Sequence, residues 1–129
     1  MAMLKLEHTG IMVSNLERSI SFYTDVLGMQ LVGTLEHNTP GLKLAFLSYP
    51  GQNAQIELIE GYADRLPDEG QVHHVAITVD DIEQEAARLR ELGVRFLDEG
   101  ITTLRNGARY IFFAGPDGER LELFQPAGA

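Results

Sequence analysis

Apolar and polar residues alternate at the start of the chain in a pattern that predicts a β-strand followed by a helix. Across residues 4–13, His8 shares one strand face with leucines and Met12, and β-branched residues occupy the other face. Ser14 and Glu17 have the spacing of a capping box, which predicts that the helix begins there. The apolar stripe of this helix consists of Leu16, Ile20, Tyr23 and Leu27. Gly28 then predicts a left-handed helix end.

The same pattern returns in the second half of the chain. His74 opens a second alternating run, 66 positions after His8. Asp80 and Glu83 restate the capping box, and Gly93 restates the glycine at the helix end. The second apolar stripe consists of Ile82, Ala86, Leu89 and Leu92. The chain is therefore predicted to contain two copies of one structural unit.

Three strand-like segments follow each predicted helix. They are residues 29–35, 42–49 and 55–60 in the first copy, and residues 94–97, 108–114 and 120–125 in the second. Turn residues at 50–53 and 115–118 join the last two segments of each copy. The order β-α-β-β-β, found twice, predicts an α+β fold. In this fold two tandem modules, about 4–60 and 72–125, form curved mixed sheets around a concave metal site, with the helices outside. We expect a single domain over 1–129, with residues 61–71 as the junction between modules.

The last predicted strand of each module carries a glutamate at a matching place. Glu57 and Glu122 are 65 positions apart, and their apolar neighbours occupy the strand face that packs against the helix. Because side chains alternate along a strand, both glutamates point to the opposite face, as His8 and His74 do. A buried carboxylate is costly unless a cation compensates its charge. A divalent metal held by His8, Glu57, His74 and Glu122 is the hypothesis that follows.

The histidines and glutamates also have a simpler interpretation. Taken singly, a histidine on a strand is more often structural, and a glutamate in a short strand is often solvated. The recurrence of both residues at matched offsets favours the metal interpretation. Aligning the two copies pairs His74 with His8, so His73 is expected to be structural, and His37 is expected in a solvated loop.

Composition narrows the class of protein. The chain has 129 residues, 44% hydrophobic and 22% charged, as in an ordinary globular domain. It has no cysteine, which excludes disulfides and thiolate metal ligands. The formal charge of −9 argues against nucleic acid or an anionic membrane as the partner, although a small anionic ligand needs only a few local cations. No segment is typical of a signal peptide or a membrane span, so we expect a cytoplasmic enzyme or binding protein.

The repeated motifs resemble the vicinal-oxygen-chelate superfamily, which includes glyoxalase I, methylmalonyl-CoA epimerase, fosfomycin-resistance thiol transferases and extradiol dioxygenases. The resemblance extends from about Leu6 to Phe124. The segments most similar to bacterial glyoxalase I are residues 8–9, 16–29, 44–46, 56–58 and 115–123. The segments closer to the CoA epimerases are residues 72–82 and 93–100.

This resemblance implies a ligand set and an assembly. By position, the metal ligands of the family fall on His8, Glu57, His74 and Glu122, with two further coordination positions left for water or substrate. It also implies a homodimer in which each site draws ligands from both chains. Nickel or zinc is the expected metal, with cobalt or manganese as alternatives, because imidazole and carboxylate suit all of them. Extradiol dioxygenases lack an acid where Glu57 stands, which weighs against that chemistry.

The resemblance further implies a lyase or isomerase of the glyoxalase I type. Such an enzyme moves a proton next to a metal-bound carbonyl through an enediolate. Glu122 is the first candidate for the base and Glu57 the second, while Glu36 is a weaker candidate from a loop. The expected substrate is a hemithioacetal or an acyl thioester. An acyl-CoA epimerase is the alternative enzyme, and a non-catalytic drug-binding protein of the same fold is the alternative from another class.

The sequence departs from glyoxalase I where glutathione is recognised. Met12 stands where the family has an arginine that anchors a glutathione carboxylate, and residues 60–63 lack the expected asparagine. Recognition of the rest of the substrate is expected to fall to loops such as residues 61–71 and 101–107. The candidate anchors for a substrate anion are Lys43, Arg105 and Arg109, each of which is also compatible with a surface position.

Overall fold

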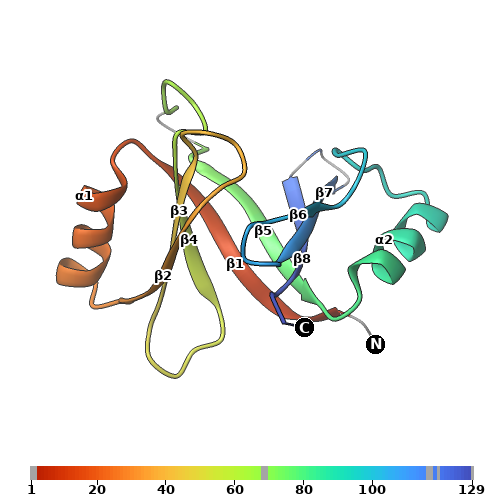
Figure 1. Cartoon of the computed structure of the whole chain (residues 1–129), viewed down its shortest axis with the longest axis horizontal. Coiled ribbons are helices and arrows are strands. Elements are labelled where there is room, and N and C mark those ends of the chain that lie inside the picture. Colours follow the sequence, from red (N-terminus) through yellow and green to blue (C-terminus); the bar gives the residue numbers. More distant parts are fainter. Residues whose placement is uncertain (1–2, 68–69, 116–117, 119, 129) are drawn as a thin grey trace. The chain divides into compact units, whose positions relative to one another are not determined.

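The computed structural model describes residues 3–67, 70–115, 118 and 120–128 (Figure 1). The chain divides into two compact units. We call residues His8–His73 the N-terminal unit, and Met1–Glu7 together with His74–Ala129 the C-terminal unit. The first strand, β1 (Met3–Val13), is divided between them. Each unit is described by itself below.

The N-terminal unit is a mixed sheet with one helical segment on its face. Its strands are β2 (Gln30–Glu36), β3 (Lys43–Ser48) and β4 (Gln55–Glu60), followed in the sheet by β1. The pairing of β1 with β4 is parallel, and β2, β3 and β4 pair antiparallel. Helix α1 (Leu16–Ser21) contacts β3 and β4, and the chain continues into a π-helical turn, η1 (Phe22–Val26). The buried residues between helix and sheet are Leu16, Ala45, Leu47 and Leu58.

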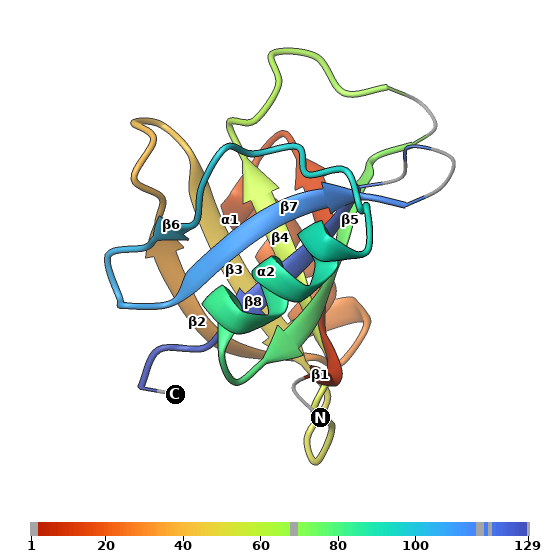
Figure 2. The same ribbon diagram turned by 90° about the vertical axis from the view of Figure 1, so that its right-hand side faces the viewer.

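The C-terminal unit repeats this arrangement. Its strand order is β1, β5 (Val72–Val79), β8 (Arg120–Gln125), β7 (Arg109–Ala114) and β6 (Thr102–Thr103). The pairing of β5 with β8 is parallel, and β7 pairs antiparallel with both β8 and β6. Helix α2 (Ile82–Glu91) packs across β7 and β8 (Figure 2). The buried core consists of Val79, Ile82, Ala86, Leu89, Ile111, Phe113 and Leu123.

The predicted fold class is confirmed: two βαβββ arrangements with mixed, curled sheets and a helix on one face of each. The predicted faces of the strands are confirmed as well. Leu58 and Leu123 are fully buried on the helix side of β4 and β8, with Ile56 and Leu121 packed beside them. Because strand side chains alternate, the glutamates between these apolar residues lie on the other face.

The two helices begin one residue later than the capping boxes predict. The N-cap residues are Asn15 and Asp81, whose side chains accept hydrogen bonds from the backbone amides of Arg18 and Gln84. Ser14 and Asp80 were therefore wrong as caps. The physical reason is that the extended backbone, with φ near −140°, falls on the second polar residue of each pair, which places its oxygen over the helical amides.

In each unit, the last residue of a strand also accepts a hydrogen bond from the first amide of the helix. These strands are β4, with helix α1, and β8, with helix α2. The Glu60 carboxylate accepts a hydrogen bond from the Leu16 amide at 2.6 Å. The Gln125 amide oxygen accepts one from the Ile82 amide at 2.9 Å. A helix N-terminus leaves its first amides without partners within the helix, so these bonds tie helix and sheet together in each unit.

The far ends of the predicted helical stripes differ from expectation. Leu27 and Leu92 are 39% and 68% exposed, so neither continues its stripe. In the first helix the chain changes to π spacing after Ser21, and Leu27 is the C-cap residue of that π turn. Leu92 is the C-cap residue of α2. The predicted glycine ends are confirmed, because Gly28 and Gly93 have positive φ angles of 76° and 85°.

One predicted strand is wrong and one short strand was not predicted. Residues 94–97 form no strand and make only a single bridge, from Phe96 to Phe113, whereas Thr102–Thr103 pairs with β7 as β6. Residues 68–69 of the predicted junction and 116–117 of the predicted turn lie outside the described residues. Of the helices that the structure describes, none is long and apolar enough to cross a membrane.

Candidate metal centre

A histidine and a glutamate are buried together in the N-terminal unit. His8 lies on β1 and Glu57 on β4, and the parallel register pairs Gly10, not His8, with Glu57. The diagonal neighbours His8 and Glu57 bring Nε2 and Oε1 to 3.5 Å, with exposed fractions of 2% and 6%.

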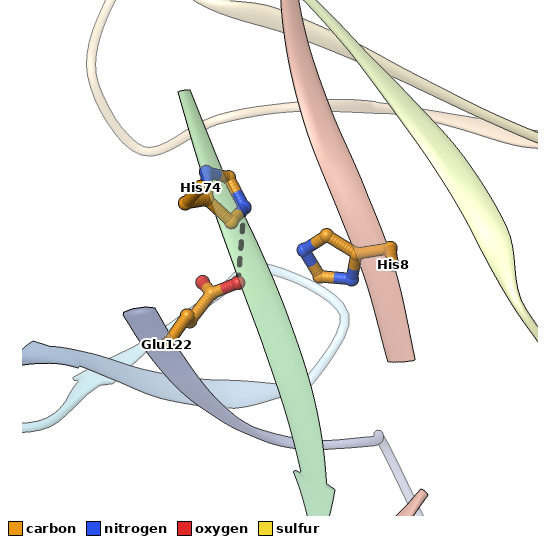
Figure 3. A group of neighbouring side chains, drawn as sticks. All are labelled: His8, His74 and Glu122. Carbon is orange, nitrogen blue, oxygen red and sulfur yellow. Dashed lines mark ion pairs between the residues drawn. The ribbon is translucent and has the colours of Figure 1, made fainter. Parts of the chain in front are cut away.

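The C-terminal unit contains the matching pair. His74 on β5 and Glu122 on β8 bring Nε2 and Oε1 to 3.1 Å, and both residues are 4% exposed (Figure 3). The register is equivalent, because the small residue Ala76 pairs with Glu122 as Gly10 pairs with Glu57. The sequence repeat therefore extends to the diagonal contact between imidazole and carboxylate.

An aromatic ring meets the edge of each histidine. Phe46 contacts His8 in a T-shaped arrangement with ring centroids 5.9 Å apart, and Phe112 contacts His74 in the same way at 5.1 Å. Phe46 is the strand partner of Glu57, and Phe112 is the strand partner of Glu122. Each phenyl ring thus covers one side of a histidine and glutamate pair, which orients the imidazole and limits the access of water.

The chemistry of these side chains fits a divalent metal. A carboxylate held away from water is costly without a cation, and a single imidazole next to it is a modest compensation. Each unit brings one imidazole nitrogen and one carboxylate oxygen together, His8 with Glu57 and His74 with Glu122, which are donors that a metal ion could use. Nitrogen and oxygen donors of this kind suit zinc, nickel, cobalt and manganese.

The other histidines and the proposed loop base are in different surroundings. The His73 ring packs against Tyr62 with centroids 4.3 Å apart, and His37 Nδ1 accepts a hydrogen bond from the Thr39 amide. Glu36 is exposed at the end of β2. The contacts of His73 and His37 are those of structural and loop residues, whereas Glu36 is the last residue of a strand and was wrongly expected in a loop.

The three candidate anchors for a substrate anion are exposed or lie in an ion pair. Lys43 and Arg105 are exposed, and Arg109 forms an ion pair with Glu83 at 3.1 Å. The sequence interpretation missed Phe46, Phe112 and Arg120, all close to the histidine and glutamate pairs. The 66-position offset between Phe46 and Phe112 equals that of the histidines, so the repeat carried a signal for the two rings.

Comparison with known proteins places the chain among relatives that share this architecture. Residues 5–123 match the profile of the glyoxalase/bleomycin resistance protein/dioxygenase superfamily. The chain belongs to this superfamily. The predicted resemblance is therefore confirmed, over nearly the whole length that the motifs indicated.

Individual proteins are similar to this chain over most of their length. The uncharacterized protein YwbC of Bacillus subtilis (strain 168) is 48% identical over 122 residues, which are 94% of this chain and 97% of that protein. The lactoylglutathione lyase of Salmonella typhimurium is 33% identical, covering 98% and 96% of the two chains. The crystal structure of methylmalonyl-CoA epimerase from Mycobacterium tuberculosis superposes with a TM-score of 0.85 at 32% identity, covering 98% of this chain and 90% of the epimerase.

Proposed function

We propose that this protein is a metal-dependent lyase or isomerase of the glyoxalase I type, which moves a proton next to a carbonyl group. The observation that carries the proposal is the pair of buried imidazole and carboxylate contacts, at 3.5 Å and 3.1 Å, in equivalent registers of the two units. A structural protein has no need for two such costly contacts. The likeness to lactoylglutathione lyases supports the same reaction class.

His8, Glu57, His74 and Glu122 would hold the divalent ion, with nickel or zinc first and cobalt or manganese as alternatives. When bound, such an ion supplies Lewis acidity that lowers the energy of negative charge on a substrate carbonyl oxygen. A Glu122 carboxylate oxygen takes the proton from the carbon beside the carbonyl and returns it to the neighbouring carbon. His74 Nε2, 3.1 Å from Glu122 Oε1, orients that carboxylate, and Phe112 keeps bulk water from it. Glu57 is the second candidate base.

A hemithioacetal is the first candidate substrate. An acyl thioester is the second, because the epimerase fold superposes on this chain so closely. Returning the proton to the same carbon, instead of the neighbouring one, would make the same carboxylates an epimerase. Met12 is buried in the N-terminal unit and offers no charge to a glutathione carboxylate.

The metal content of purified protein tests the proposal directly. We expect near-stoichiometric metal after reconstitution, measured by elemental analysis, and its loss in His74→Ala. His73→Ala is the matched control, because it removes the adjacent imidazole that packs on Tyr62. Absence of bound metal in the wild-type protein would favour a non-catalytic binding protein and contradict the proposal.

Turnover rates distinguish the lyase from the acyl-CoA epimerase. We expect the metal-loaded protein to convert the hemithioacetal of methylglyoxal and glutathione faster than it epimerises methylmalonyl-CoA. The opposite order would replace the lyase with the epimerase. Absence of both reactions in a metal-loaded protein would contradict both substrates.

We also propose a homodimer in which each metal site draws one histidine and glutamate pair from each chain. Complementation tests this arrangement. His8→Ala and Glu122→Gln proteins are each expected to be inactive, while their heterodimer contains one site free of both substitutions. Activity that reappears after the two variants are unfolded together and refolded supports shared sites. Activity that stays absent, with heterodimers present, contradicts them.

A further inference from the structure

A cation lies beside the proposed base in the C-terminal unit. Arg120 and Glu122 are two residues apart on β8, so their side chains share the sheet face opposite helix α2. Two residues of a strand span about 7 Å. Arg120 is half-buried and pairs in the sheet with Ala114, a small residue.

The guanidinium of Arg120 is positioned by an aromatic ring that belongs to the site. Its Cζ atom lies 5.4 Å from the ring centroid of Phe112, within the range of a cation–π contact. The same ring meets the edge of His74. One phenyl ring therefore contacts both the Arg120 guanidinium and the His74 imidazole.

The matching position of the N-terminal unit has no charge. Gln55 stands two residues before Glu57, as Arg120 stands two residues before Glu122. The cation is thus an asymmetric addition to a symmetric arrangement. In a chain with a net charge of −9, an arginine placed over a ring next to buried acids favours an anionic group on the ligand.

We propose that Arg120 determines specificity by binding a carboxylate of the substrate that lies a few bonds beyond the reacting carbonyl. The proposal rests on the proton-transfer function above and narrows its substrate class to carbonyl compounds with a distal carboxylate. The planar guanidinium can donate two parallel hydrogen bonds to such a carboxylate, which a lysine cannot reproduce.

Calorimetric titration of metal-loaded protein with two probes tests this assignment. The probes are 2-oxoglutarate and its 5-methyl ester, which share the 2-oxo acid end and differ in a distal carboxylate or a neutral ester. We expect wild-type protein to bind 2-oxoglutarate about tenfold or more tightly than the ester, as a charge-assisted contact provides. In Arg120→Met the ratio should fall to near one with the affinity for the ester unchanged, and Arg120→Lys should keep only part of it.

Arg90→Met is the matched control. Arg90 also lies over a phenyl ring, that of Phe96 at 4.5 Å, but it projects from helix α2. The Arg90→Met substitution therefore removes the same charge and the same kind of cation–π contact, but away from the site. Arg120→Gln, which installs the side chain of the N-terminal counterpart, serves if the methionine variant melts at a lower temperature than wild type.

An unchanged ratio in Arg120→Met, an equal loss in Arg90→Met, or the absence of a preference in wild type would each overturn the assignment. A different result, the effect of removing the metal, would contradict the proposed function. If chelation of the metal leaves the affinity for both probes unchanged, the metal-dependent site is wrong, whatever the ratio between the probes.

Discussion

The two units of this protein agree where the chemistry is proposed and differ around it. Both place an imidazole and a carboxylate on diagonal positions of a parallel strand pair, with a small residue opposite the carboxylate. Both add a phenyl ring at the edge of the histidine. The features that agree are those that hold and shield the imidazole and carboxylate of each unit.

The differences lie in the helices, the cores and one charge. The C-terminal unit has a ten-residue helix and the larger buried core, whereas the N-terminal unit has a six-residue helix that passes into a π turn. Its imidazole and carboxylate are also farther apart, at 3.5 Å against 3.1 Å. The two copies of the fold therefore present the same pair of candidate ligands, although their helices and buried cores differ in size.

The largest expected effect is a loss of turnover that differs between the two glutamates. Glu122→Gln should lower kcat by about 10²- to 10⁴-fold, because a positioned base contributes that much, and Glu57→Gln should lower it less. Steady-state kinetics on metal-loaded protein with circular dichroism as a folding check measures this. Glu91→Gln, exposed at the end of α2, is the control and should be fully active. Retained activity in Glu122→Gln would remove this residue from proton transfer.

Core truncation compares the stability of the two units. Leu58→Ala and Leu123→Ala each remove a fully buried side chain and should each cost about 2–5 kcal/mol in free energy of unfolding. Leu123 should cost more, because its core holds more buried residues. Urea unfolding measures both, with the 68%-exposed Leu92→Ala expected to change stability by less than about 0.5 kcal/mol. A larger loss at Leu58 would reverse the ranking of the cores.

A glycine at the end of β4 distinguishes the units by backbone geometry. Gly61 has a φ of 95°, and a Cβ there would lie 2.2 Å from the carbonyl oxygen of Gly41, whereas Pro126 stands at the matching place in the C-terminal unit. Gly61→Ala should therefore cost about 2 kcal/mol or more. Gly51→Ala has a similar φ of 80° but no atom within 4 Å, so it should cost about 1 kcal/mol. Equal thermal shifts for the two variants would contradict the close approach.

The smallest effect tests where each helix begins. Asn15→Ala and Asp81→Ala should each cost about 1 kcal/mol, because each removes the acceptor for an N-terminal amide. Asp81 should cost slightly more, since its charge also interacts with the helix dipole. Ser14→Ala and Asp80→Ala are the paired controls and should leave thermal stability nearly unchanged. A larger loss in either control would restore the capping boxes that the sequence predicts.

Much of the fold was predictable because its signals are local. Period-two alternation identified both strands that carry the histidines, and helical spacing identified both helices. Faces were predicted as well, since a strand that buries Leu58 toward a helix must turn Glu57 the other way. Predictions failed where two local options were nearly equal, as between Ser14 and Asn15 for the helix cap, or where a segment is held by one bridge, as at Phe96.

By itself, the sequence determined which residue types recur and on which strand face each lies, because alternation and helical period are properties of neighbouring residues. Only the tertiary structure decided which recurring residues touch. The contact of His74 with Glu122 depends on the register of β5 against β8, and the contact of Arg120 with Phe112 depends on that of β7 against β8. The parallel strands β5 and β8 are joined by a long crossover, so no short turn fixes their register, and the packing of residues distant in the chain sets it.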